Sequence, residues 1–428
     1  MSKRVLVYPC GTEIGLEVFK SVCNSIHFDL FGGSSSYDHG RFVYGNHIDN
    51  LPFITDYSDK ENVREFISII KNYGFDYIYP AMDGVLLKFA EYRDCFPCNV
   101  IAPATETVRI TRSKKETYKL FADLLVIPKV YESDVTLKFP VFVKPDVGQG
   151  ASGTAIVHDN EELTLNIKTR EPGDYLLLEY LPGEEYTIDC FTNSSGDLVY
   201  MSGRARRRVK GGISVNAVRV ENSEFRRIAE VINSNLKFQG AWFFQLKENR
   251  DGRLALLEIA PRIAGGSALA RCYGANLPLM TLHLFNGQLI DSVLINDYEL
   301  ELDRALHNRY RNSIKYSHVY VDFDDTLLIN GRVNLLLIAF LYQCVNDKIP
   351  VTLLTRRKEA LQQCLYDHRL ESLFDNVITL GNGENKSEYI KETDAIFIDD
   401  SFGERMEVQK ERRINVFNAN MIECLLHI

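Results

Sequence analysis

The stretch that most constrains this chain is residues 139–153, FPVFVKPDVGQGASG. The apolar run at residues 141–143 is too short for a helix and rich in strand formers, and Pro145 ends the strand pairing. Three glycines follow, and glycine lets a backbone turn sharply so that several N–H groups converge on one anion. Lys144 would then place a cation over the same phosphate. The alternative is a β-hairpin with a flexible turn and one surface lysine.

Two downstream segments predict further strands that could complete a phosphate-binding site with this loop. Residues 176–189 read LLLEYLPGEEYTID, which predicts a strand, a Pro-Gly break and a second strand. Residues 242–262 read WFFQLKENRDGRLALLEIAPR, which predicts two strands joined by a turn at Asp251-Gly252. In this order the segments resemble the ATP-grasp superfamily, and most closely its carboxylate–amine ligases and its carbamoyl-phosphate-synthetase-like branch. The resemblance covers about residues 5–302.

Composition excludes several classes of protein. Hydrophobic residues make up 45% of the chain and charged residues 25%, an ordinary balance for a globular protein. The net charge of -9 argues against a nucleic-acid-binding protein. No apolar run reaches the roughly 20 residues that span a membrane, and a strand begins too early for a signal peptide. We therefore expect a cytoplasmic protein with reduced cysteines, in which Cys95 and Cys98 form the only CxxC pair.

The 428 residues predict three domains. Residues 1–104 alternate strands and helices, as a small parallel α/β domain does. By the resemblance this is a Rossmann-like pre-ATP-grasp domain, whose turn at residues 11–13 faces the substrate cleft. Residues 105–307 would form the ATP-grasp domain, with a lid subdomain at about residues 139–204. A polar connection at residues 308–317 precedes a third domain at residues 316–428.

The ATP-grasp resemblance implies ATP and Mg²⁺ as cofactors and assigns the residues that bind the nucleotide. The phosphates would be bound by two lysines and the glycine loop: Lys114, Lys144, Gly148, Gln149, Gly150, Ser152 and Gly153. Lys115 stays open as the alternative to Lys114. The backbone of the hinge at Glu179, Tyr180 and Leu181 would bind adenine, and Glu185 would bind the ribose hydroxyls.

The two strands at residues 242–262 carry the predicted metal site. Gln245 and Glu258 should lie side by side, and their oxygens are the hard ligands that Mg²⁺ prefers. The family has an asparagine two residues after this glutamate, where this chain has Ala260, so a second metal ion is in doubt. Arg262 matches the family's arginine that stabilises the transferred phosphoryl group.

Residues 203–214, GRARRRVKGGIS, are rich in arginine. On a strand, Arg204, Arg206 and Arg208 would share one face, because side chains alternate. They could protect an edge strand from aggregation. We expect instead that they bind a substrate carboxylate or phosphate, without choosing among the three.

The pattern restarts after residue 317. Three predicted strands, at residues 318–321, 351–354 and 395–398, each end in a polar residue of a catalytic type. The carboxyl ends of parallel strands meet at one edge of a sheet, which is where a site forms. From about residue 316 onward the chain resembles the haloacid-dehalogenase-like (HAD) phosphatases. The spacings leave no room for a cap domain, so the third domain should be a capless HAD-like Rossmannoid domain.

The HAD resemblance assigns a role to each of these polar residues. Asp322 would be the nucleophile and Asp324 the general acid/base. Thr355 and Lys386 would bind phosphate oxygens, with Lys391 as a less favoured substitute for Lys386. Mg²⁺ would be held by Asp322, the backbone carbonyl of Asp324 and Asp399. Asp400 would position Asp399 or bind the ion through water.

The predicted fold is therefore α/β and α+β multidomain, and the predicted protein is bifunctional. One site would be an ATP-dependent carboxylate–amine ligase that acts through an acyl phosphate and releases ADP and phosphate. The other would be an Mg²⁺-dependent phosphomonoesterase. The alternative is a phosphatase whose ATP-grasp part only binds nucleotide as a regulator. The expected partners are small-molecule carboxylates and amines, some of them phosphorylated, with no nucleic acid and no membrane; a homodimer stays open.

Overall fold

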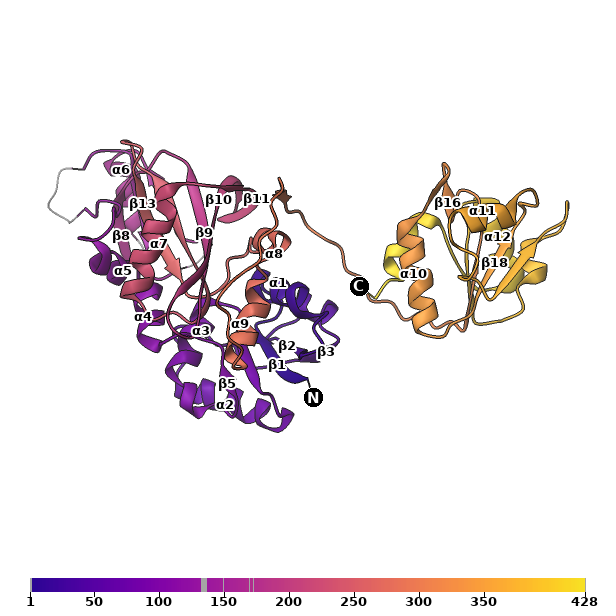
Figure 1. Ribbon diagram of the computed structural model, residues 1–428, viewed down its shortest axis with the longest axis horizontal. Coiled ribbons are helices and arrows are strands. Elements are labelled where there is room, and N and C mark those ends of the chain that lie inside the picture. Colours follow the sequence, from indigo (N-terminus) through magenta and orange to yellow (C-terminus); the bar gives the residue numbers. More distant parts are fainter. Residues whose placement is uncertain (1, 132–136, 149, 169, 172, 428) are drawn as a thin grey trace. The chain divides into compact units, whose positions relative to one another are not determined.

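The computed structural model describes residues 2–131, 137–148, 150–168, 170–171 and 173–427. The chain forms two compact units, Met1–Leu306 and His307–Ile428 (Figure 1). The first unit joins two of the domains that the sequence predicts separately, because they share one core. Val5 and Phe28 of the N-terminal sheet pack in one cluster with Phe191 and with Leu282 of a late helix.

The N-terminal sheet is parallel, with the strand order β3-β2-β1-β4-β5. Its strands are β1 (Lys3–Tyr8), β2 (Phe28–Gly33), β3 (Asn46–Ile48), β4 (Tyr77–Pro80) and β5 (Asn99–Val100). The helices α1 (Glu13–Val22), α2 (Lys60–Ile70) and α3 (Asp83–Glu91) connect them. The parallel α/β domain predicted from the alternation of strands and helices is confirmed. Its strands end in loops that carry Cys10, Thr12 and Ser34.

A small antiparallel sheet carries the glycine loop, with the order β7-β6-β8. It consists of β6 (Val141–Pro145), β7 (Ala155–Val157) and β8 (Tyr175–Glu179), with α6 (Asn160–Ile167) between the last two. The predicted lid boundary at residue 204 is wrong, because the small sheet ends at Glu179. The next strands, β9 (Glu185–Thr192) and β10 (Leu198–Lys210), pair with each other in a larger sheet. The Pro-Gly break at residues 182–183 is where the chain changes sheets.

The larger sheet has the order β13-β12-β9-β10-β11-β14. Its remaining strands are β11 (Ile213–Val220), β12 (Gly240–Glu248), β13 (Leu254–Ala260) and β14 (Glu301–Asp303). Further helices of this unit are α4 (Thr105–Arg112), α5 (Lys114–Phe121), α7 (Ser223–Asn235), α8 (Ala268–Tyr273) and α9 (Leu277–Phe285). Trp242 is buried beneath α7, and its Nε1 donates a hydrogen bond to Thr192 Oγ1 at 2.8 Å.

The second unit has its own parallel sheet, with the order β19-β18-β15-β20-β21. The strands are β15 (His318–Val321), β18 (Val351–Thr355), β19 (Asn376–Thr379), β20 (Ala395–Ile398) and β21 (Asn415–Phe417). A short hairpin, β16 (Leu328–Ile329) and β17 (Arg332–Val333), follows the first strand, and the helices are α10 (Leu335–Asn346), α11 (Leu361–Asp367) and α12 (Phe402–Arg412). The central position of β15 and β20 brings their carboxyl ends together.

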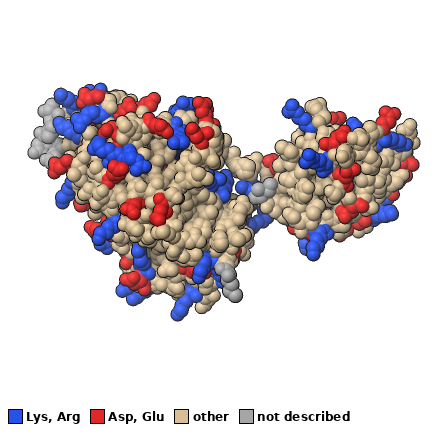
Figure 2. All heavy atoms as spheres, in the orientation of Figure 1, with Lys and Arg blue, Asp and Glu red and all other residues tan. Residues whose placement is uncertain are grey.

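Short 3-10 helices complete the described structure. They are η1 (His39–Phe42), η2 (Lys71–Tyr73), η3 (Arg93–Cys95), η4 (Lys386–Tyr389) and η5 (Ala419–Cys424). Lys386 lies in η4, which is a single 3-10 turn. Cys95 and Cys98 are both free thiols. Figure 2 shows positive and negative side chains interspersed over the visible face of each unit. None of the helices in the described ranges combines the length and apolarity needed to cross a bilayer.

We expect the two units to unfold in separate transitions, because each has its own core. Phe66 is fully buried against Tyr8 and Phe89, with ring centroids 4.8 and 5.0 Å away. Phe66→Ala should lower the stability of the first unit by about 3–5 kcal/mol and leave the second transition in place. Phe397→Ala, a truncation of a fully buried ring in the second unit, should do the reverse. Scanning calorimetry measures both, and one shared transition that moves in both variants would contradict this expectation.

Candidate active sites

A cavity of about 270 Å³ lies between the small sheet and the larger sheet. Its wall brings together most of the predicted nucleotide-binding residues: Lys114, Lys144, Gly148, Gly150, Ser152, Glu179, Tyr180, Leu181, Glu185, Gln245 and Glu258. Apolar side chains, including Phe142, Ile156 and Leu257, line it as well. Gln149 lies outside the described residues. Gly153 is not among the described lining residues, although its φ of +70° belongs to the same turn.

Two buried lysines carry the positive charge of this cavity. The Nζ of Lys144 donates to the Leu257 carbonyl at 3.1 Å, and the Nζ of Lys114 donates to the Asp146 carbonyl at 3.0 Å. Lys115 instead donates to the Gly173 carbonyl, so Lys114 is the lysine that lines the cavity. Burial lowers the pKa of Lys144 to about 8, against the opposing effect of the Glu258 carboxylate. Burial also lowers the pKa of Lys114.

Gln245 and Glu258 lie directly opposite each other on β12 and β13. Both line the first cavity and a second one, and Glu258 also lines a small hollow beside Arg262. The carboxylate of Glu258 therefore stands where the three spaces meet. An amide oxygen and a carboxylate oxygen at this junction suit Mg²⁺. Ala260, two residues farther along β13, packs against Phe243 and offers no further ligand.

The second cavity, of about 260 Å³, is lined by charged side chains from distant parts of the first unit. The turn with Thr12 and Glu13, which the resemblance placed at a substrate cleft, forms one wall. The other charged lining residues are Arg204, Arg206, Glu258, Arg262 and Arg304. The backbone of Gly265 and Gly266 closes the wall between them; a Cβ at Gly266 would lie 2.8 Å from Arg204 Nη1.

Two of the three predicted arginines, Arg204 and Arg206, line the second cavity. Arg204 is buried, and its Nε lies 2.9 Å from Asp189 Oδ2. Arg206 contacts Glu185 and donates to Gln245 Oε1 at 3.3 Å. The prediction is wrong for Arg208, because β10 is bulged between Arg206 and Arg208. The Arg208 side chain is exposed and pairs with Asp303 at 2.7 Å.

Arg262 forms a buried fork with Asp83, with both N–O distances at 2.5 Å. Burial raises the pKa of Asp83, but the Arg262 guanidinium outweighs it and lowers that pKa overall. Arg112 donates to Asp56 at 2.6 Å and to the Gly148 carbonyl at 2.9 Å, which ties α4 to the glycine loop. Sequence reasoning missed Arg112, Asp83, Asp189 and Arg304. Arg112 lies two residues before the predicted Lys114, so its position could have suggested a role. Nothing in the sequence around Asp83 indicates that it pairs with Arg262.

In the second unit the carboxyl ends of β15 and β20 bring three predicted residues together. The Nζ of Lys386 lies 2.5 Å from Asp322 Oδ1 and 2.6 Å from Asp399 Oδ2, and all three side chains are buried. One carboxylate oxygen each from Asp322, Asp399 and Asp400 lies within 4.8 Å of the others. Hard oxygens this close fit a divalent cation. Burial raises the pKa of Asp322 to about 7, with Lys386 opposing the shift.

The remaining predicted residues of this site lie around that cluster. Thr355 is buried at the end of β18, and its Oγ1 accepts a hydrogen bond from the Arg357 backbone N–H at 3.1 Å. Asp324 pairs with Arg357 at 2.6 Å, a contact that sequence reasoning missed. The Lys391 backbone N–H donates to the Tyr320 hydroxyl at 3.4 Å. Lys386 is thus the lysine that contacts the carboxylates.

Comparison with known proteins gives a family match for residues 171–303, to "ATP-grasp in the biosynthetic pathway with Ter operon". The 3-methyl-D-ornithine–L-lysine ligase of Methanosarcina mazei is 26% identical over 231 residues, which are 53% of this chain and 59% of the ligase. The large chain of carbamoyl phosphate synthase of Clostridium beijerinckii is 30% identical over 138 residues, 29% of this chain and 13% of that protein. This chain thus matches less than two thirds of either relative.

Solved structures resemble the fold at low sequence identity. The biotin carboxylase domain of 2-oxoglutarate carboxylase from Hydrogenobacter thermophilus, in complex with MgADP, ADP and bicarbonate, matches with a TM-score of 0.57 and 15% identity. That match covers 69% of this chain and 73% of that one. N5-carboxyaminoimidazole synthetase from Staphylococcus aureus, complexed with ADP, matches with a TM-score of 0.54 and 15% identity over 69% of this chain and 80% of that one. The chain therefore has an ATP-grasp fold, preceded by an N-terminal parallel-sheet domain.

Proposed function

We propose that the first unit is an ATP-dependent carboxylate–amine ligase. The observation that carries this proposal is the position of Glu258, between a lysine-lined cavity and an arginine-lined cavity. The first cavity offers apolar walls and a backbone hinge for a nucleotide, and the second offers charged groups for a polar substrate. A residue between the two lies where a phosphoryl group would pass from one to the other.

ATP with Mg²⁺ fits the first cavity. Lys114 and Lys144 neutralise triphosphate charge, and the hinge at residues 179–181 presents backbone groups to the base. Gln245 and Glu258 would hold Mg²⁺, which would neutralise charge on the transferring phosphate. Arg262, held in place by Asp83, steadies that phosphate from the side of the second cavity. A free carboxylate has a poor leaving group, and phosphorylation supplies one that an amine can displace.

The name of one relative supports an acid and an amine as substrates, since it is a ligase that joins an amino acid to an amino acid derivative. In the second cavity Arg204 and Arg206 suit a substrate carboxylate or phosphate, and Glu13 suits an amine. The competing function is a nucleotide-binding regulator without ligase chemistry. Release of ADP that depends on both an acid and an amine separates the two.

Glu258→Gln should lower substrate-dependent ADP release by about 100-fold or more, the scale of losing one transition-state charge partner. The change keeps the size of the side chain but removes the charge that holds the ion. The matched control is Glu221→Gln, whose side chain is 84% exposed and pairs only with Arg219 in the described structure. A coupled assay of ADP with a panel of acids and amines measures both variants. Full activity in Glu258→Gln would refute the assignment.

Nucleotide affinity should fall with rising pH, because the pKa of Lys144 is lowered to about 8. Below that pH the ammonium is charged and attracts the triphosphate; above it the neutral amine does not. The dissociation constant for ATP should rise toward tenfold per pH unit from about pH 8 upward. Lys144→Arg stays charged at these pH values, so its affinity should fall less steeply, with only Lys114 left to titrate. Calorimetric titration at several pH values checks this, and the same slope in both proteins would contradict it.

We further propose that the second unit hydrolyses phosphate monoesters in the manner of HAD phosphatases. The observation in its favour is the buried contact of Lys386 with Asp322 and Asp399 at the ends of two parallel strands. Asp322 attacks phosphorus, Asp324 protonates the leaving oxygen and then activates water, and Thr355 with Lys386 binds the phosphate oxygens. Asp322, the backbone carbonyl of Asp324 and Asp399 would hold Mg²⁺, which would lower the charge repulsion between the nucleophile and the phosphate.

Asp322→Asn should lower hydrolysis of a generic phosphomonoester by about 1,000-fold or more, because the amide cannot act as nucleophile. ADP release by the first unit should not change. Asp367→Asn, an exposed residue of α11, is the matched control. Hydrolysis that survives in Asp322→Asn would exclude an aspartyl-phosphate intermediate. If the wild-type protein hydrolyses no phosphomonoester while its ligase is active, the phosphatase proposal is wrong and the ligase proposal still stands.

A further inference from the structure

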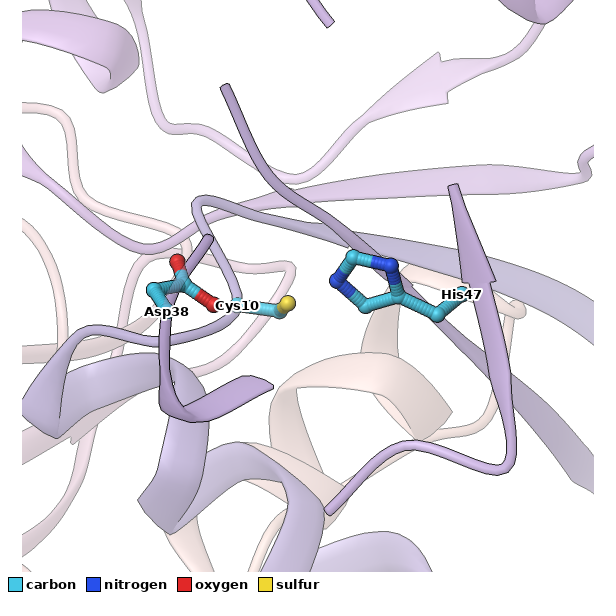
Figure 3. A group of neighbouring side chains, drawn as sticks. All are labelled: Cys10, Asp38 and His47. Carbon is cyan, nitrogen blue, oxygen red and sulfur yellow. The ribbon is translucent and has the colours of Figure 1, made fainter. Parts of the chain in front are cut away.

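A thiol, a hydroxyl, a carboxylate and an imidazole converge at the N-terminal sheet, and none of these four groups lines the cavities described above. Cys10 follows β1, Ser34 follows β2, Asp38 precedes η1, and His47 lies on β3. Figure 3 shows the side chains of Cys10, Asp38 and His47 pointing toward one another from these separate segments. One ligand-type atom from each of the three lies within 4.8 Å of the others.

Ser34 Oγ lies at the centre of this group. It is 3.1 Å from Cys10 Sγ, 2.9 Å from Asp38 Oδ2 and 3.2 Å from His47 Nε2. A tetrahedral zinc ion with bonds of about 2.0–2.3 Å has ligand atoms about 3.3–3.8 Å apart, so a small outward shift suffices. The single hydroxyl hydrogen of Ser34 cannot serve both the carboxylate and the imidazole. The contact between Ser34 and His47 takes its hydrogen from either residue, according to the tautomer of the imidazole.

The far side of the imidazole carries the partner that metal-bound histidines need. His47 Nδ1 lies 3.2 Å from Asp49 Oδ1, and Asp49 Oδ2 lies 3.4 Å from Arg41. A histidine ligand almost always donates its other ring N–H to a carboxylate, which fixes the tautomer and aims the lone pair at the metal. Here His47 Nδ1 makes an ion-pair contact with Asp49 without hydrogen-bond geometry, and Nε2 faces Ser34 Oγ. A slight rotation of the ring or of the Asp49 side chain would be needed to complete the hydrogen bond.

The backbone is packed tightly around the thiol. A Cβ at Gly40 would lie 2.1 Å from Cys10 Sγ, and a Cβ at Gly32 would lie 2.9 Å from it. These two positions therefore keep room for the sulfur among the other three groups. Cys10 is completely buried, whereas the His47 side chain is 10% exposed and that of Asp49 39% exposed. A small ion can thus reach the group from the Asp49 side, and a large ligand cannot.

We propose that Cys10, Asp38 and His47 bind a zinc-type divalent cation, with Ser34 Oγ or a water as the fourth ligand and Asp49 as the outer partner of His47. On binding, the Cys10 S–H proton passes to solvent and a sulfur–metal bond forms, with no change of oxidation state. The ion would tie the loop after β1 to the segment before η1 and to β3. Because Thr12 and Glu13 follow Cys10 and line the second cavity, the ion would also fix that wall.

Cobalt(II) added to the metal-free full chain tests the proposal directly. Cobalt bound by a thiolate gives a near-ultraviolet charge-transfer band, which the oxygen ligands at Glu258 and at Asp322 cannot give. We expect this band to saturate at one cobalt per chain and to disappear when zinc is added. Cys10→Ser and His47→Ala should abolish it. Cys98→Ser, a change at a partly buried thiol of the same sheet domain, should leave it unchanged.

Asp49→Asn serves as a second variant that should fold normally, because the Asp49 side chain is 39% exposed and the change keeps its size. It should keep the band but weaken zinc affinity by about 10–100-fold, measured by competition with a chromophoric chelator. If metal-free wild type shows no thiolate band at any cobalt concentration, the four groups form a closed hydrogen-bond network and the proposal is wrong. A band that persists in a folded Cys10→Ser variant would also overturn it.

Discussion

The architecture of the first unit depends on the charge balance around Glu258. Two lysines are buried in one cavity, where desolvation lowers the pKa of both, and Glu258 is the carboxylate that opposes this shift most strongly. A buried charge is costly unless a partner compensates it. The pairing of β12 with β13 sets that partner opposite Gln245, so one hairpin fixes both the charge balance and the pair of oxygen ligands. The small sheet and the larger sheet can then enclose a polar space without leaving a lone ammonium group.

The second unit also buries charged groups beside one another, but here two carboxylates surround one ammonium group. Two buried aspartates at neighbouring strand ends repel each other, and burial raises the pKa of both. Burial lowers the pKa of Lys386, but the two carboxylates outweigh this effect and raise it overall. The central strands of a parallel sheet bring such groups together at one edge without help from loops. Arg357 adds a second cation beside Asp324, so each acidic residue of the proposed mechanism except Asp400 has a basic partner in the described structure.

The sequence predicts those parts of the two sites that depend on short-range features, such as a turn or the end of a strand. The turn at Asp251-Gly252 fixes the hairpin, and the hairpin fixes the register of Gln245 and Glu258. Strand ends in the second unit likewise predict which aspartates meet. The predicted lid boundary was wrong because a Pro-Gly break looks the same in the sequence in two cases. The next strand can return to the same sheet or enter another one. The prediction for Arg208 was wrong because β10 is bulged after Arg206, and a run of arginines does not indicate where a strand bulges. Asp83 lies 179 residues from its partner Arg262, and no periodicity reports such a contact.

Arginine side chains of the second cavity are already paired with carboxylates of the protein before a substrate enters. Arg204 is held by Asp189 and Arg262 by Asp83, so a substrate anion competes with an internal carboxylate for each guanidinium. Such pairs hold the forks in a fixed orientation, which lowers the entropy lost when a substrate binds. Two buried polar atoms near this wall, Asp189 Oδ1 and Arg206 Nε, have no hydrogen-bond partner among the described residues. Burying an unsatisfied polar atom is unfavourable, and both atoms are closed off from solvent, so this cost stays with the protein. The ion pairs of Arg204 with Asp189 and of Arg206 with Glu185 oppose that cost, and they hold the two guanidinium groups at the cavity wall.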